Sequence, residues 1–131
     1  MDLSLYWAIL ISSVMYTDLD IRFVHQNYNL KPFDKLVMFL HSIIMMYLVI
    51  GVIFLDRRDI FVHLFTLIGI MILWQANNHC VLSLYMEKSV DYSDHDYDRI
   101  IMKYPDRLNF HLSVALPILL IDAIKLIYIS K

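Results

Sequence analysis

The stretch from Leu36 to Leu55 contains no charged side chain, and this run constrains the fold more than any other feature of the sequence. A transmembrane helix needs about 20 mostly apolar residues to cross roughly 30 Å of hydrocarbon. The part from Ile43 to Leu55 is apolar on every side of a helix, whereas a helix at the surface of a soluble protein keeps polar side chains on one face. The run therefore predicts a helix that spans a membrane.

Three further apolar runs predict three further spans, and the four expected spans cover about residues 3–24, 36–55, 60–80 and 108–129. The first run is long enough only if it extends past Asp18 and Arg22, which can pair near the membrane surface. The predicted fold class is all-α, a polytopic membrane protein in which residues 1–131 form a single transmembrane domain. Four transmembrane helices form an antiparallel bundle, with one longer polar loop, residues 87–107, between helices 3 and 4.

The composition of the chain favours a lipid environment. Hydrophobic residues make up 60% and charged residues 18% of the chain, against about half and a quarter in an average soluble domain. Eleven Lys and Arg face thirteen Asp and Glu, so no excess of basic charge points to a nucleic-acid partner. The alternative is a soluble bundle of buried helices. Against it, several aromatic residues near the ends of the runs suit a membrane interface: Tyr6, Trp7, Trp74, Tyr85 and Tyr128.

Four spans place both chain ends and the tight turn Asp56–Asp59 on one side of the membrane, with the two longer loops on the other. The side of the longer loops carries seven Lys and Arg and the opposite side carries four. The positive-inside rule then favours a cytoplasmic position for the longer loops. The adjacent arginines of the tight turn, Arg57 and Arg58, favour the opposite orientation, with the turn in the cytoplasm, so the orientation stays open.

Polar side chains at membrane depth are costly, so they mark candidate sites. Six of them are expected near the side of the longer loops, and they are His41, Asn77, Asn78, His79, Cys80 and His111. A transition-metal site is one interpretation, but no CxxC or HxxxH spacing supports it. Hydrogen bonding between helices and to interfacial water is the simpler interpretation of this polar cluster.

A haem b held between helices 2 and 4 by His41 and His111 is a further interpretation, because histidines on facing helices can ligate haem iron. His111 precedes Asp122 by eleven residues, and this spacing resembles the His-then-Asp pattern in the membrane anchors of succinate dehydrogenase. Those anchors follow the Asp with Tyr, whereas Ala123 stands there in this chain. The resemblance implies a redox membrane-anchor subunit as an alternative function.

Asp122 lies well inside the fourth apolar run. An intramembrane ion pair with Lys125, one helical turn further on, is the expected arrangement, and Arg57 and Arg58 are second candidate partners. Ion or proton conduction through Asp122 is an alternative function, since such pathways use carboxylates inside the membrane. His63, just past the tight turn, is interpreted as a capping or interfacial residue.

The sequence contains no recognisable catalytic constellation. It lacks the G-x-S-x-G, HExxH and P-loop signatures. The acidic segment that begins at Asp94 resembles the start of an EF-hand calcium loop. However, Arg99 replaces its required glycine and Pro105 its closing glutamate. No catalytic residue and no resident metal is predicted, and a non-enzyme is favoured.

The third apolar run ends in a set of spaced residues, Trp74, Asn77, Asn78, Cys80, Leu82 and Ser83. This W-x-x-N-N-x-C-x-L-[ST] pattern resembles a signature of small multi-span membrane proteins of large DNA viruses. Leu73 stands where that pattern has His. The resemblance implies a virion component that lies in an internal membrane beneath a capsid.

The leading hypothesis is a structural or interaction protein, a small four-helix subunit of a larger membrane or virion assembly. Its expected partners are membrane lipid and other membrane or capsid proteins. Its expected localisation is integral to a membrane, and the sequence does not fix which one.

Overall fold

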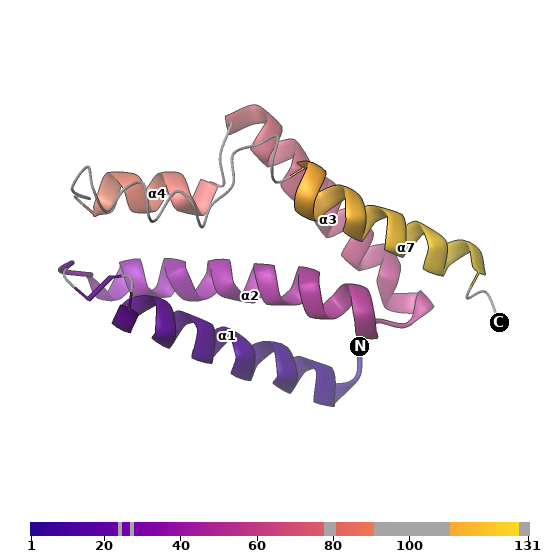
Figure 1. The fold of residues 1–131 in the computed structure, drawn as a ribbon, viewed down its shortest axis with the longest axis horizontal. Helices are drawn as coiled ribbons and strands as arrows, with labels where there is room; N and C mark the ends of the chain where they lie inside the picture. Colours follow the sequence, from indigo (N-terminus) through magenta and orange to yellow (C-terminus); the bar gives the residue numbers. More distant parts are fainter. Residues whose placement is uncertain (24, 27, 78–80, 91–110, 129–131) are drawn as a thin grey trace.

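The computed structural model describes residues 1–23, 25–26, 28–77, 81–90 and 111–128, apart from the side chains of residues 83, 87, 111 and 112. Every element in this part of the chain is a helix (Figure 1): α1 (Leu3–Phe23), α2 (Pro32–Phe54), α3 (Arg57–Asn77), α4 (Val81–Ser89), the π-helix η1 (His111–Ala115) and α7 (Leu116–Tyr128). The prediction of an all-α chain is confirmed for these residues. Two helices, α2 and α3, are long and apolar enough to cross a membrane.

Two aspartates fix the start of α2 and the turn into α3. Oδ2 of Asp34 accepts a hydrogen bond from the backbone N–H of Lys31 at 2.8 Å. Beyond the C-terminal end of α2, Oδ1 of Asp56 accepts hydrogen bonds from the backbone N–H groups of Arg58 and Asp59 at 3.1 and 3.2 Å. The first N–H groups of a helix have no partner within the helix, so these side chains cap both helices. As a result, α3 begins directly after α2 ends.

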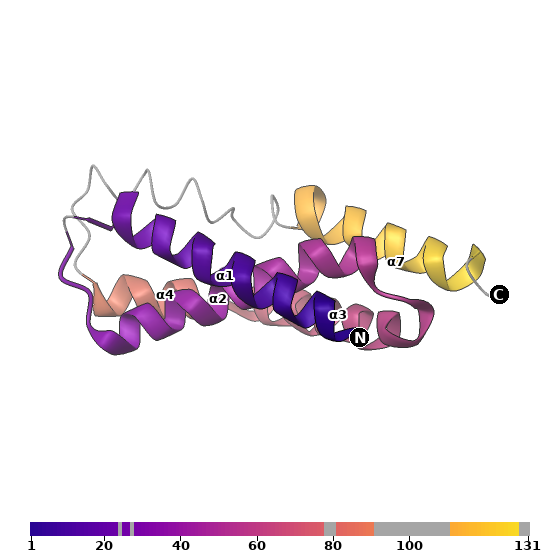
Figure 2. The same ribbon diagram turned by 90° about the horizontal axis from the view of Figure 1, so that it is seen from below.

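α1 lies along α2 over most of its length (Figures 1 and 2). Leu5 and Ile9 form one end of its buried face, and small hydroxyl side chains continue it. Among these, Oγ1 of Thr17 donates a hydrogen bond to Oγ of Ser42 on α2 at 3.0 Å. Small hydroxyl residues let two helices approach closely and bond across their interface, so α1 and α2 pack as a pair.

The other helices pack against different parts of α2. α7 lies beside α3, and a core around Leu48, Leu67 and Ala115 joins α2, α3 and the η1–α7 segment. α4 lies beside the first half of α2 (Figure 1), with Met38 and Met86 in their shared core. α2 is therefore the central helix of the fold.

Within the described residues, eight polar side chains are buried alongside an apolar core, while many large apolar side chains are exposed. The buried polar residues are Ser13, Thr17, Asp20, His25, Asp34, Ser42, His63 and Asp122. Among the apolar side chains, Phe23 on α1 is 72% exposed and Ile127 on α7 is 67% exposed. Buried polar groups and extensive exposed apolar surface are each unusual in a soluble protein.

Candidate functional site

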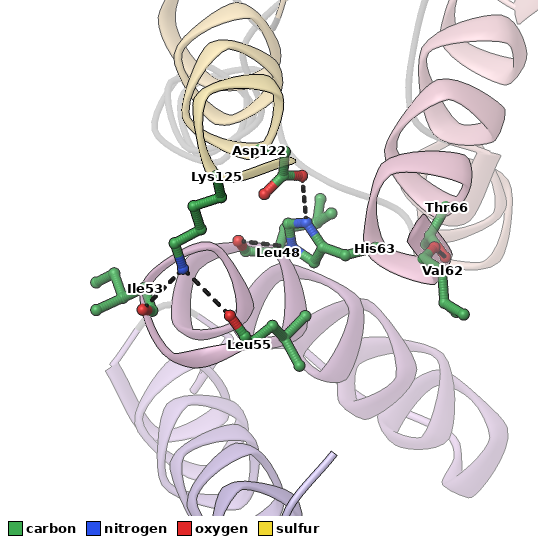
Figure 3. A network of polar contacts seen from close by, with 8 residues as sticks. All are labelled: Leu48, Ile53, Leu55, Val62, His63, Thr66, Asp122 and Lys125. Atoms are coloured by element: carbon green, nitrogen blue, oxygen red, sulfur yellow. Dashed lines mark hydrogen bonds and ion pairs between the residues drawn. The ribbon is translucent and has the colours of Figure 1, made fainter. Parts of the chain in front are cut away.

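A histidine and an aspartate from different helices meet in the interior of the fold (Figure 3). His63 lies on α3 and Asp122 on α7, 59 residues further along the chain. The distance between Nδ1 of His63 and Oδ2 of Asp122 is 2.6 Å, and both side chains are 0% exposed. This short contact joins the α2–α3 hairpin to α7.

The second ring nitrogen of His63 determines how many protons the pair holds. Nε2 lies 3.2 Å from the backbone carbonyl oxygen of Leu48. A carbonyl oxygen only accepts hydrogen bonds, so Nε2 carries a hydrogen and donates it. The contact between Nδ1 and Oδ2 requires a second proton between those two atoms, whichever of them binds it. The pair is therefore neutral as a unit, which keeps net charge out of the interior.

α2 shapes the space around the His63 ring. A Cβ atom added at Gly51 would lie only 2.9 Å from Cδ2 of His63 and 3.0 Å from its Nε2, so no larger residue fits there without displacing the ring. The ring of Tyr47, one helical turn earlier, meets the His63 ring edge to face with centroids 5.1 Å apart. Tyr47, Leu48 and Gly51 together form the α2 side of the site.

Lys125, which the sequence pairs with Asp122, has different partners in the structure. Its Nζ donates to the carbonyl oxygen of Ile53 at 2.9 Å and to that of Leu55 at 3.4 Å (Figure 3). The last carbonyls of a helix lack partners within it and carry partial negative charge. The ammonium group therefore caps the end of α2, and Asp122 pairs with His63 instead.

The interpretation of His63 as a capping or interfacial residue is wrong, because its side chain is fully buried. One signal in the sequence could have indicated the pair. His63 stands six residues from the start of α3 and Asp122 six residues from the end of α7, so both lie about two turns from helix ends that are expected on one side of the membrane. Isolated polar groups at equal depth are natural partners.

The structure describes only part of the predicted polar cluster near the longer loops. The Asn77 side chain is exposed, and its Nδ2 donates to the carbonyl of Leu73 in its own helix at 2.9 Å. His41 and Trp74 line a small apolar cavity of about 90 Å³ between α2, α3 and α4. Asn78, His79, Cys80 and the side chain of His111 lie outside the described residues. The haem hypothesis therefore stays a prediction, which an absorbance scan of the purified protein checks.

A second polar cluster lies at the other end of α2 and surrounds Asp34. Oδ1 of Asp34 accepts hydrogen bonds from the hydroxyl groups of Tyr85 at 3.2 Å and Ser89 at 2.5 Å. Both hydroxyls belong to α4, so the cluster fastens this short helix to the first turn of α2. With the Lys31 N–H on Oδ2, both carboxylate oxygens of Asp34 are bonded.

Chemically, the His63–Asp122 pair can do two things. It can fasten three helices, and it can hold a proton that is shared between two atoms. Within the described part of the chain, no three His, Cys, Asp or Glu side chains gather as a metal site would require. No protein family, curated protein or solved structure matches the chain.

Proposed function

We propose that the chain is a structural subunit of a membrane assembly, in which α1, α2, α3 and the η1–α7 segment cross the bilayer as an antiparallel bundle. Its outward faces contact lipid and partner proteins. The observation that carries the proposal is the distribution of side chains, with many large apolar groups exposed on the outside and several polar groups buried within the apolar core.

The exposed apolar side chains support a lipid environment. Phe65 on α3 is 71% exposed and Phe54 at the end of α2 is 68% exposed. Removing apolar surface from water is worth about 25 cal/mol per Å². A soluble chain would gain stability by covering these rings, whereas hydrocarbon surrounds them without that penalty.

The buried polar groups support the same environment. In hydrocarbon each polar group must find its partner within the protein. Hydrogen bonds between helices supply such partners, since Thr17 on α1 bonds to Ser42 on α2, and His63 on α3 bonds to both Asp122 and α2. In this proposal the polar groups determine which helix faces meet, and lipid solvates the exposed apolar side chains.

The helix lengths fit the proposal. α1 and α3 have 21 residues each and α2 has 23, which corresponds to about 32–35 Å at 1.5 Å per residue and suffices for roughly 30 Å of hydrocarbon. The fourth crossing is formed by the five residues of η1 and the thirteen of α7. It is the shortest of the four.

The kind of assembly is suggested by the resemblance of Trp74–Ser83 to the signature of small multi-span membrane proteins of large DNA viruses. On that resemblance, we propose that the subunit lies in the internal membrane of a virion, with capsid or other membrane proteins as partners. Co-purification of this chain with virion membrane proteins is the expected result, and its recovery only outside virions would contradict this assignment.

Single-cysteine labelling tests the four crossings. Cys80 is replaced by serine to remove the chain's one cysteine, and Asn29→Cys or Arg58→Cys is then introduced at an exposed position. Four crossings put these two positions on opposite sides of the membrane. A membrane-impermeant maleimide added to sealed vesicles should label only one of them, and detergent should make both reactive.

Labelling of both positions from the same side of intact vesicles would contradict four crossings. Release of the chain from membranes by alkaline carbonate, without detergent, would contradict membrane integration itself.

A further inference from the structure

We propose that the His63–Asp122 pair is a proton-binding site that exchanges its shared proton with water through a groove between α1 and α3, and that the Tyr47 ring gates this route. The proposal goes beyond the structural role of the pair, and it does not depend on which assembly the subunit joins. It rests on three observations about the described residues.

The first observation is an incompletely bonded carboxyl group. Within the described part of the chain, Oδ1 of Asp122 is buried and has no hydrogen-bond donor, while the ammonium group of Lys125 contacts the end of α2. A structural ion pair in the interior normally satisfies all its lone pairs, because an unbonded polar atom there is costly. Asp122 instead depends on one partner, which shares one proton with it.

The second observation is a groove close to the pair. A cavity of about 430 Å³ is lined by residues of three helices, among them Ile9 of α1, Tyr47 of α2 and Thr66 of α3. Asp59 lies at its outer end, where its carboxylate pairs with the N-terminal amine. The groove thus reaches from a charged end of the bundle toward the middle of α3.

The third observation concerns Tyr47, which lines this groove and also packs edge to face against the His63 ring. The Tyr47 ring therefore separates the groove from the buried pair. Water that enters the groove from its charged Asp59 end reaches His63 when this ring rotates. The titratable or charged groups near the route are Tyr47 on α2, Asp59 on α3, Lys125 on α7, and Tyr6 and the N-terminal amine on α1.

The exchange step is a simple proton transfer. The N–H or O–H bond that holds the proton between Nδ1 and Oδ2 breaks, and a groove water molecule receives the proton as hydronium. The pair is left with one negative charge. The reverse transfer restores the neutral pair, so the site binds and releases one proton.

The test is the rate at which deuterium from solvent replaces the His63 ring N–H protons, measured by NMR on the folded chain in detergent micelles. Tyr47→Ala opens the gate and should speed exchange about tenfold or more, because a local opening step is no longer needed. Tyr47→Phe keeps the ring and loses only the hydroxyl that bonds to Thr66, so its exchange rate should stay much closer to that of the wild type than the rate of Tyr47→Ala. Tyr85→Ala is the matched control, since it removes the same ring from the Asp34 cluster on α4.

A second variant covers the case in which Tyr47→Ala fails to fold. Val62→Phe puts a larger apolar side chain into the same groove and should slow the exchange. An unchanged rate in Tyr47→Ala would overturn the proposal, and so would an unchanged rate in Val62→Phe. Equal acceleration in Tyr47→Ala and Tyr85→Ala would overturn it as well, because it would indicate general loosening instead of a gated route.

Discussion

Two buried aspartates, Asp34 and Asp122, hold other helices against α2, but they are satisfied in different ways. Asp34 accepts hydrogen bonds from a backbone N–H and two hydroxyl groups. Asp122 contacts one titratable partner, His63, and its second oxygen has no donor among the described residues. Losing one donor leaves Asp34 with two others, whereas losing His63 leaves Asp122 with none. The α2–α3–α7 junction should therefore respond sharply to single substitutions, and the α2–α4 junction gradually.

The largest effect is expected for His63→Leu. This variant leaves the buried Asp122 without its partner, and breaking a buried pair in this way costs about 3–5 kcal/mol. Unfolding by SDS in mixed micelles, followed by circular dichroism, measures the loss. The double variant His63→Leu with Asp122→Leu is the control and should recover most of the stability, because no unpaired polar group remains. A His63→Leu variant as stable as the wild type would contradict a stabilising role of the His63–Asp122 contact.

A smaller effect is expected for Gly51→Ala, which forces its methyl group against the His63 ring. Overpacking of this kind typically costs about 1–3 kcal/mol. Gly69→Ala is the matched control, because a Cβ atom there meets nothing within 4 Å. It should be neutral or stabilising by up to about 1 kcal/mol, the helix preference of Ala over Gly. Equal effects of the two variants in the same unfolding assay would show that the contact with His63 is unimportant.

The smallest effects are expected at the Asp34 cluster. Tyr85→Phe and Ser89→Ala each remove one of three donors to Asp34 and should each cost about 1 kcal/mol. Hydrogen exchange of the α4 backbone amides should rise in both variants, since α4 is the helix that these hydroxyls fasten, while exchange in α7 stays unchanged. A single substitution that releases α4 completely would remove the contrast between the two junctions.

Much of the helical architecture follows from the sequence, because long apolar runs without charge leave few alternatives to helices. The end of α2 was predicted to within one residue, since the Asp56 turn follows it, whereas its start was predicted at Leu36, four residues after the observed start at Pro32. The predicted third span ends at residue 80, and no helix was predicted to pack on α2 from Val81 to Ser89. That packing depends on hydrogen bonds to Asp34, which lies 51 positions before Tyr85 in the sequence.

The partner of Asp122 was harder to predict for a physical reason. Sequence spacing identifies Lys125 as a neighbour on the same helix, but the rotation of α7 against α3 decides which group the carboxyl meets. That rotation depends on packing details such as the clearance at Gly51 and the position of the Leu48 carbonyl. His63 and Asp122 were each recognisable as unusual residues in apolar runs, and only the fold shows that they meet.

The two tryptophans give the most direct test of the claim that this bundle is solvated by lipid. Trp7 on α1 is 55% exposed and Trp74 on α3 is 5% exposed. Single-tryptophan variants, Trp74→Phe and Trp7→Phe, are reconstituted in bilayers whose lipid acyl chains carry bromine, a contact quencher of fluorescence. The arrangement predicts strong quenching of Trp7 and little quenching of Trp74. Quenching of Trp7 by aqueous iodide but not by the brominated chains would contradict it.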